Sequence, residues 1–443
     1  MNQPPPNNQQ PYWQPDPQQQ WQQPWDLPPP PQKKRGKGAF GCLTGFLTLL
    51  LIIVLVLFCF GLLRNLVPPG WESSTLPPLP TAASTTLPPR APGDPPHLPQ
   101  AGRVRSHYKA LAEDEKQAYD AILTALPEFP ERIEIPRLGE NGISNVYYAL
   151  LRDHPLLFHL SSESMTKTSG GKTWFCPAYR MNRAEYEKHC KELEAVCASI
   201  AVTIPEDATQ FETELALHDA LVGLCDYSYT GSADENTAYG ALVLGKAACE
   251  GYSRALVLLL DQQGIDCCII TGDATNSTGE TSKHAWNKVR IDGAWYQVDS
   301  TWNDPVGADG GSPRSPLHSY FNLTDAEMGL THALTPDDMP CTATKANYFA
   351  VKGLLFRQID RDAEAVLAQT LAEAVDAGAE LLEFRCETRA AYDAAVERLF
   401  EDQRIYRILS NADIASRRKI SSQRVSFTEI KALHILQIIP VLG

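Results

Sequence analysis

The sequence predicts an α+β fold, in which a helix that carries a cysteine precedes an antiparallel sheet and a small α/β unit follows. Two observations lead to this fold class. The segment 245–264 places apolar residues at helical spacing and ends in a glycine, which favours a helix stop. Two β-rich runs, 284–291 and 294–301, are joined by Asp292-Gly293, a strong signal for a two-residue hairpin turn.

The first hundred residues contain no segment that could form a globular core. Residues 1–38 are rich in Pro and Gln and are expected to be a disordered tail, which either docks a cytoplasmic partner or is inert. Residues 39–63 carry no charge and, at ~1.5 Å per residue, are long enough for one transmembrane helix across a ~30 Å hydrocarbon core. Residues 64–103 are rich in Pro, Ser and Thr and are expected to form a semi-stiff linker.

The charges that flank residues 39–63 predict the orientation of the chain. Four basic side chains lie between residues 33 and 37, whereas Arg64 is the only cation close behind the span. Basic residues favour the cytoplasmic side of a membrane. We therefore expect a single-pass protein of the cell membrane, with the N-terminus in the cytoplasm and the C-terminal part outside.

The external part is expected to divide into an N-terminal helical and mixed part (104–205), the core that carries the cysteine (206–345) and a C-terminal α/β unit (346–443). Besides the elements named above, helical periodicity predicts helices at 104–126, 145–152, 182–200, 207–224, 362–377 and 389–400. Short β-rich runs predict strands at 132–136, 267–271, 348–356, 380–386 and 435–441.

Composition excludes some classes of protein. The net charge is −14 and the globular part has no basic run, which argues against binding to nucleic acid. There are eleven cysteines, nine of them after residue 63, and their pairing cannot be read from the sequence. Cys190 and Cys197 would lie about 10 Å apart along one helix, too far for a disulfide.

The hairpin brings two polar side chains to one face. If the turn has two residues, Trp286 faces Asp299 and His284 faces Thr301, and all four share a face of the sheet. His284 and Asp299 are then diagonal neighbours with Cβ atoms roughly 7 Å apart. The Asp299 carboxylate could accept the imidazole N–H and fix its tautomer, as the third member of a catalytic triad does.

Cys249 lies near the start of its helix, where the helix dipole and free N–H groups favour an anion. Thiol pKa values fall at such positions and beside an imidazolium, and the thiolate is the nucleophilic form. Each residue alone is more often structural: a buried Cys, a core His, a turn Asp. The combination of a helix-start Cys with His and Asp on one face of the next hairpin favours a thiol active site.

Several stretches of the sequence resemble bacterial cell-surface members of the transglutaminase-like superfamily. The strongest are GKAACEGYSRAL and KHAWNKVRIDGAWYQVDSTWNDP, supported by ELALHDALVGLCDYSY, TAYGALVLGKA and HSYFNLTDAEM. The resemblance covers roughly residues 145–350. It implies a papain-like scaffold with Cys249 as the nucleophile, His284 as the base and Asp299 as the orienting acid.

The same resemblance marks four further positions. His218, Tyr252, Trp286 and Trp302 match positions characteristic of the group, where scaffold or pocket-lining roles are expected rather than direct catalysis. No cofactor is expected. No calcium-loop motif occurs, and the adjacent Cys267 and Cys268 would point to opposite faces of a strand, so no metal site is expected.

The resemblance leaves the reaction open, because the superfamily includes cross-linkers, peptidases, amidases and inactive binding modules. The leading expectation is a membrane-anchored extracellular enzyme that cleaves or transfers amide or acyl groups of protein or peptidoglycan peptides through a cysteine thioester. Whether water or an amine resolves the thioester is not determined. One alternative is a non-catalytic surface adaptor on the same scaffold. Another is a sensor whose cytoplasmic tail carries the function.

Overall fold

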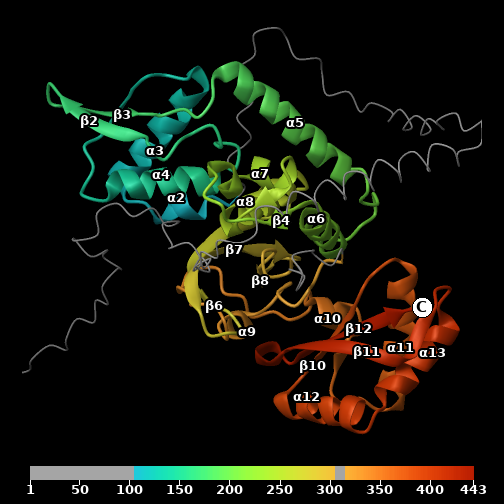
Figure 1. The fold of residues 1–443 in the computed structure, drawn as a ribbon. Coiled ribbons are helices and arrows are strands. Elements are labelled where there is room, and N and C mark those ends of the chain that lie inside the picture. Colours follow the sequence, from blue (N-terminus) through green and yellow to red (C-terminus); the bar gives the residue numbers. More distant parts are fainter. Residues whose placement is uncertain (1–103, 305–314) are drawn as a thin grey trace, which may run out of the picture. The chain divides into compact units, whose positions relative to one another are not determined.

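The computed structural model describes residues 104–304 and 315–443 (Figure 1). The predicted tail, membrane helix and linker lie outside the described residues. Among the helices of the described part, none combines the length and the apolar character needed to cross a bilayer. By its internal contacts the chain divides at Asp94, and all the described residues belong to the unit that follows, Pro95–Gly443.

The first part of the described chain packs helices against a three-stranded antiparallel sheet. Its elements are α2 (Ser106–Ala110), α3 (Glu113–Ala125), β1 (Ile133–Ile135), α4 (Gly142–Asp153), β2 (Met165–Ser169) and β3 (Lys172–Cys176), with the strands in the order β1-β3-β2. The single helix predicted over 104–126 is wrong. Leu111 is extended, and a new helix begins where Glu115 accepts the backbone N–H of Ala112 at 3.0 Å.

The second part is built around one buried helix. Its elements are α5 (Arg183–Ala201), α6 (Gln210–Leu224), β4 (Asp226–Tyr227), α7 (Ala238–Leu242), β5 (Lys246–Ala247) and α8 (Cys249–Gln262). Capping boxes start α5 at Asn182 and α6 at Thr209. In helix α8 every residue from Gly251 to Leu260 is buried. The sequence analysis expected this helix to begin at Gly245. It begins at Cys249 instead, because β5 pairs with β4 just before it.

The predicted hairpin is confirmed and belongs to a three-stranded antiparallel sheet in the order β6-β7-β8. The strands are β6 (Cys267–Thr275), β7 (Thr281–Ile291) and β8 (Ala294–Val298). Ile291 pairs with Ala294 across the turn, and Asp292 and Gly293 both have positive φ angles, 49° and 85°. These are the signs expected for a type I′ turn. Helix α8 packs against β6 and β7, so the cysteine helix covers one face of this sheet.

The remaining residues form a short connection and an α/β unit. Their elements are α9 (Asp325–Met328), α10 (Tyr348–Val351), β9 (Leu355–Phe356), α11 (Arg361–Asp376), β10 (Leu382–Cys386), α12 (Arg389–Val396), α13 (Ile405–Ala415), β11 (Ile420–Ile430) and β12 (Ile435–Leu442). The four strands lie in the order β11-β12-β10-β9, with β9 parallel to β10 and the other pairs antiparallel. A separate hydrophobic cluster that includes Leu367, Phe384 and Ile408 fills this unit.

Some elements differ from the sequence prediction. The strand expected at 348–356 is wrong for its first half, because the Asn347 side chain accepts the N–H of Phe349 at 3.2 Å and starts helix α10. The sequence analysis did not predict the β2–β3 hairpin, helix α13 or strand β11.

One buried acid in α6 makes stability depend on pH. Glu214 is fully buried, and its Oε2 accepts a hydrogen bond from Asn322 Nδ2 at 2.7 Å. Burial raises the pKa of Glu214 to about 8, against the lowering effect of that hydrogen bond. Since the ordinary value is about 4.3, the folded protein holds this group protonated at neutral pH.

Glu214→Gln is expected to stabilise the protein increasingly as pH rises. The native pKa lies above the unfolded one, so the stability that protonated Glu214 contributes is fully present below about pH 4.3 and is lost as pH rises through about 8. The difference in unfolding free energy between variant and wild type should grow by at most about 1.4 kcal/mol per pH unit in that window. Urea unfolding at pH 5, 6, 7 and 8 measures it. A difference that does not change with pH would contradict the assignment.

Candidate active site

The start of α8 holds Cys249 in a fixed position. The N–H of Ala248 donates to the carbonyl of Glu235 at 2.8 Å, which ties the helix to the preceding 3₁₀ turn. A side chain at Gly251 would place its Cβ 2.4 Å from the same Glu235 oxygen, so this close approach requires glycine. Cys249 is the first residue of the helix and is partly exposed. Its thiol therefore lies at the positive end of the helix dipole.

The hairpin brings His284 to Asp299. His284 Nε2 lies 2.8 Å from Asp299 Oδ2. The β7–β8 ladder ends at the pair Asn287–Val298, one residue before the predicted pair of Trp286 and Asp299. Beyond it the N–H of Asp299 donates to the carbonyl of Tyr320 at 3.0 Å. The predicted contact of His284 and Asp299 therefore forms, although the ladder does not continue to Thr301.

The Asp299 carboxylate accepts four hydrogen bonds. Oδ1 accepts the backbone N–H groups of Thr301 at 3.0 Å and Trp302 at 3.1 Å. Oδ2 accepts His284 at 2.8 Å and a second histidine, His332, at 3.1 Å. The Asp299 residue is 0% exposed. These donors compensate for the loss of water around a fully buried anion.

Sequence reasoning missed His332. It lies 33 positions after Asp299, outside any periodic element that the sequence predicts. The nearest signal is the Thr324–Glu327 capping box, which starts the one-turn helix α9 just before it. That motif predicts a helix start and gives no information on which side chain follows it into the site.

The electrostatics of the pair favour a charged imidazole. Burial alone would lower the pKa of His284, but the charge and hydrogen bond of Asp299, together with the Cys249 side chain, raise it to about 10. Burial would raise the pKa of Asp299, but His284 and His332 hold it well below its ordinary value. Since Nε2 of His284 is bonded to Asp299, Nδ1 is the ring nitrogen left to interact with Cys249, whose side chain is among the groups that raise the pKa of His284.

Two of the predicted pocket residues lie against His284. The Trp286 ring is nearly parallel to the imidazole, at 6.2 Å and 19°, and its indole N–H donates to Gln297 Oε1 at 2.7 Å. The Trp302 ring lies 5.6 Å from the imidazole. Trp286 is 1% exposed and Trp302 partly exposed. Together they remove water from one side of the His284–Asp299 pair.

Tyr252 holds the loop that follows Asp299. It lies one turn after Cys249 in α8 and is completely buried. Its hydroxyl lies 2.7 Å from both the carbonyl of Cys225 and Oδ2 of Asp304. Asp304 also accepts the N–H of Tyr227, the second residue of β4, at 3.1 Å. The structure thus places Tyr252 in the scaffold, between α8, β4 and the loop.

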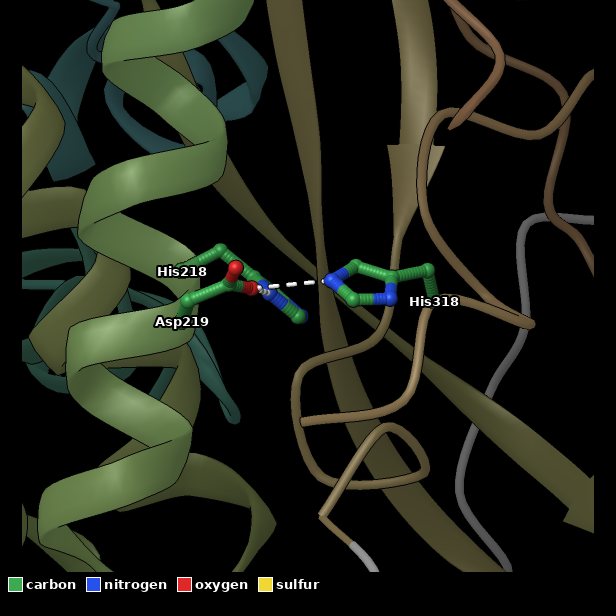
Figure 2. A group of neighbouring side chains, drawn as sticks. All are labelled: His218, Asp219 and His318. Carbon is green, nitrogen blue, oxygen red and sulfur yellow. Dashed lines mark hydrogen bonds and ion pairs between the residues drawn. The ribbon is translucent and has the colours of Figure 1, made fainter. Parts of the chain in front are cut away.

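His218 belongs to a second network, of which Figure 2 shows His218, Asp219 and His318. Its Nδ1 lies 2.9 Å from Asp219 Oδ1 and its Nε2 lies 3.0 Å from Asn303 Nδ2. The amide oxygen of Asn303 accepts the N–H of Tyr320 at 2.8 Å, so its nitrogen must be the group that faces His218. Nε2 of His218 therefore accepts and Nδ1 carries the proton. This neutral, fully buried histidine positions the loop around Asn303.

His318 connects this network to the C-terminal α/β unit. Its Nε2 lies 3.0 Å from Asp219 Oδ1 (Figure 2). Glu383 on β10 accepts its backbone N–H at 2.7 Å. Its ring stacks on Tyr348 at 3.8 Å. Burial would lower the pKa of His318, but the two carboxylates raise it to about 9. At neutral pH an imidazolium therefore lies between α6 and β10.

Within residues 104–304 and 315–443, two groups have ligand atoms close enough together to hold a metal ion: His218, Asp219 and His318, and His284, Asp299 and His332. The surroundings of His218 do not fit a ligand. A metal on Nδ1 would move the proton to Nε2, where it would face the N–H of Asn303 instead of an acceptor. In the second group the contacts to Oδ2 of Asp299 have hydrogen-bond lengths, 2.8 and 3.1 Å. We therefore interpret both groups as hydrogen-bond networks.

Comparison with known proteins identifies the part of the chain that holds this site. Residues 198–300 match the family model of the transglutaminase-like superfamily. The chain contains a transglutaminase-like domain. Cys249, His284 and Asp299 all lie within the matched residues, whereas His318 and His332 follow them. No curated protein matches the chain.

Solved structures share only limited parts of the fold with this chain. A "TGase" structure is 14% identical with a TM-score of 0.23, covering 38% of this chain and 50% of that one. A putative cysteine protease from Cytophaga hutchinsonii is 11% identical with a TM-score of 0.22, covering 34% and 67%. Menin is 13% identical with a TM-score of 0.19, covering 53% and 52%. The chain thus spans half the length of the TGase, and the assignment of the domain rests on the family model.

The His318 network predicts a stability that depends on pH. The native pKa of His318, about 9, lies above the ordinary 6.5, so its contribution is fully present below about pH 6.5 and is lost as pH rises through about 9. Glu383→Gln should lower the unfolding free energy by roughly 1–3 kcal/mol at pH 6.5 and by clearly less at pH 9.5. Chemical unfolding at both pH values measures this.

Ser319→Ala is the matched control, because Ser319 Oγ donates to the same carboxylate at 2.6 Å but does not titrate. Ser319→Ala should lower the unfolding free energy by a similar amount at both pH values. Equal losses for Glu383→Gln at pH 6.5 and 9.5 would show that His318 is not the charged partner.

Proposed function

We propose that this protein is a cysteine-dependent enzyme that cleaves or transfers amide groups of protein or cell-wall peptides, anchored at the outer face of the cell membrane by residues 39–63. The observation that carries the enzymatic part is the complete set Cys249, His284 and Asp299 in a transglutaminase-like domain, with the Asp299 carboxylate held by four donors. The membrane placement rests on the uncharged span and its basic flank alone.

The proposed reaction begins with a thiolate on Cys249 and an imidazolium on His284. The thiolate attacks the carbonyl carbon of an amide, and free N–H groups at the start of α8 stabilise the developing oxyanion. Nδ1 of His284 then gives its proton to the departing amine as the C–N bond breaks, which leaves a thioester on Cys249. Water or a second amine attacks the thioester, returns a proton to His284 and restores the thiolate. Asp299 keeps its negative charge throughout.

An exposed apolar surface supports a peptide as the substrate. Tyr227 and Tyr229 follow the end of α6 and are 47% and 40% exposed. Leu244, which precedes β5, is 50% exposed. Tyr227 pairs with Ala247, two residues before the proposed nucleophile, so β4 runs beside the residues that lead to Cys249. Exposed aromatic residues are enriched where proteins bind other chains. A polypeptide that lies across β4 would present its amide to the thiol.

The proposal predicts a covalent acyl-enzyme. Full-length protein incubated with glutamine-containing peptides or wall-type peptides, then quenched in acid, should carry an acyl adduct on Cys249. Peptide mass spectrometry locates it among the nine free thiols of the described residues. Cys249→Ala should lack the adduct, and His284→Ala should form it at least about 100-fold more slowly, the usual contribution of a general base. Peptide binding without an adduct or product would instead favour the non-catalytic adaptor.

The role of Asp299 is tested with a variant of the same shape. In Asp299→Asn an amide N–H replaces Oδ2, so the proton of His284 must move from Nε2 to Nδ1, where it faces the thiol. Alkylation of Cys249 by iodoacetamide at pH 6 should slow by roughly tenfold or more, because the activated thiolate is lost.

Asp304→Asn is the control for this variant. Asp304 lies on the same loop and is also buried, but it accepts hydrogen bonds from Tyr252 and Tyr227 rather than from His284. The rate at which iodoacetamide alkylates Cys249 in this variant should stay within about threefold of wild type. If both variants slow equally, the loss reflects the loop and not the tautomer of His284.

A further inference from the structure

Two imidazoles share one carboxylate oxygen in this site. His284 Nε2 and His332 Nε2 lie 2.8 and 3.1 Å from Oδ2 of Asp299, and the side chains of Asp299 and His332 are both 0% exposed. We propose that His332 is a positioning residue of the thiol site, a neutral donor that fixes Asp299 and through it the tautomer of His284. This inference rests on the proposed function and concerns how the same site is held in its reactive form.

The fold clamps the backbone of His332 from two sides. Its N–H donates to the carbonyl of Met328 at the end of α9, at 2.9 Å. The N–H of the next residue, Ala333, donates to Asp273 on β6 at 2.7 Å. A Cβ at Gly272 would lie 2.5 Å from the carbonyl of Ala333, so the segment packs closely on β6 because that residue is a glycine. The backbone that carries the His332 ring is therefore held in a fixed position relative to β6.

The hydrogen bonds assign the protons. An ionised carboxylate only accepts, so each Nε2 that faces Oδ2 must carry a hydrogen. Nδ1 of His332 lies 2.9 Å from Thr331 Oγ1, whose other contact, to the carbonyl of Met328, is longer at 3.4 Å. When the Thr331 hydroxyl donates along the shorter contact, Nδ1 carries no hydrogen and His332 is the neutral donor that we propose. A neutral donor orients Asp299 without cancelling the negative charge that stabilises the His284 imidazolium.

The surroundings of His332 argue against a role as the general base that exchanges protons with Cys249 or the substrate. Its ring contacts Trp302 at 4.6 Å, Trp286 at 4.9 Å and Tyr320 at 5.8 Å. Both ring nitrogens have protein partners, and the side chain is completely buried. His284, in contrast, bonds Asp299 through Nε2 and lies close enough to Cys249 for that side chain to raise its pKa. His332 thus acts through Asp299 rather than on the substrate.

Two substitutions separate the donor from the ring. His332→Phe keeps an aromatic ring in the Trp286–Trp302 surroundings but removes the N–H. His332→Gln retains an N–H close to the position of Nε2. Iodoacetamide alkylation of Cys249 at pH 6 in the full-length protein should slow about tenfold or more in the Phe variant, the loss expected for one hydrogen bond to a buried charge. The alkylation rate of Cys249 in the Gln variant should lie within about threefold of wild type.

Each outcome has a distinct meaning. Equal rates for wild type, Phe and Gln, with Cys249 reactive at pH 6, would overturn the role of His332 and leave the proposed function intact. A wild-type Cys249 that reacts only above pH ~8.5, as an ordinary thiol does, would overturn the proposed function itself. Equal slowing in both variants would also overturn the inference, because the donor would then not be the property that matters.

A measurement on the wild type is independent of how the variants fold. Nitrogen-15 spectra of the full-length protein labelled at histidine distinguish Nε2–H, Nδ1–H and imidazolium forms. The inference expects His332 as the neutral Nε2–H form at pH 7, with its signal identified by its loss in His332→Gln. An Nδ1–H form or an imidazolium at His332 would overturn it.

Discussion

The carboxylate of Asp299 is the contact on which the rest of the site depends. It is fully buried, and burial of an unpaired anion would cost several kcal/mol. Two of its four donors are imidazoles, one on β7 and one in the segment after α9. The other two are successive backbone N–H groups of the loop after β8. The buried anion is therefore compensated only when all three segments are in place. The anion in turn raises the pKa of His284 and leaves Nδ1 for the thiol of Cys249. Folding of these three segments therefore also sets the orientation and charge of His284.

The C-terminal α/β unit supports this arrangement although it carries no part of the triad. Arg385 on β10 forms an ion pair of 2.7 Å with Glu327, and Glu327 is also the carboxylate that accepts the N–H of Thr324 at the start of α9. Glu383 on the same strand holds the backbone of His318. Through β10 the unit therefore fixes both the helix that precedes His332 and the residues that precede Tyr320, whose carbonyl accepts the N–H of Asp299.

The parts of the site that the sequence predicts are those set by local rules. The Asp-Gly pair determines the hairpin register, and the register places His284 beside Asp299. The start of α8 was predicted four residues too early, because the strand β5 that precedes it forms only by pairing with β4. His332 and the His318 network could not be predicted, because they depend on contacts between segments far apart in the chain. The β2–β3 hairpin carried a local signal that was overlooked, since Gly170-Gly171 has positive φ at both turn residues. The proposed membrane placement rests on residues outside the described part, and the domain boundaries stay predictions.

The proposed function depends most on the claim that Cys249 reacts as a thiolate beside the His284 imidazolium. The ultraviolet absorbance of the thiolate tests it most directly, as the difference between wild type and Cys249→Ser titrated from pH 4 to 10. The account predicts that the thiolate signal persists well below pH ~8.5, the value for a free thiol, and that Asp299→Asn shifts its loss upward towards that value. A difference signal that appears only above pH ~8.5 in the wild type would contradict the account.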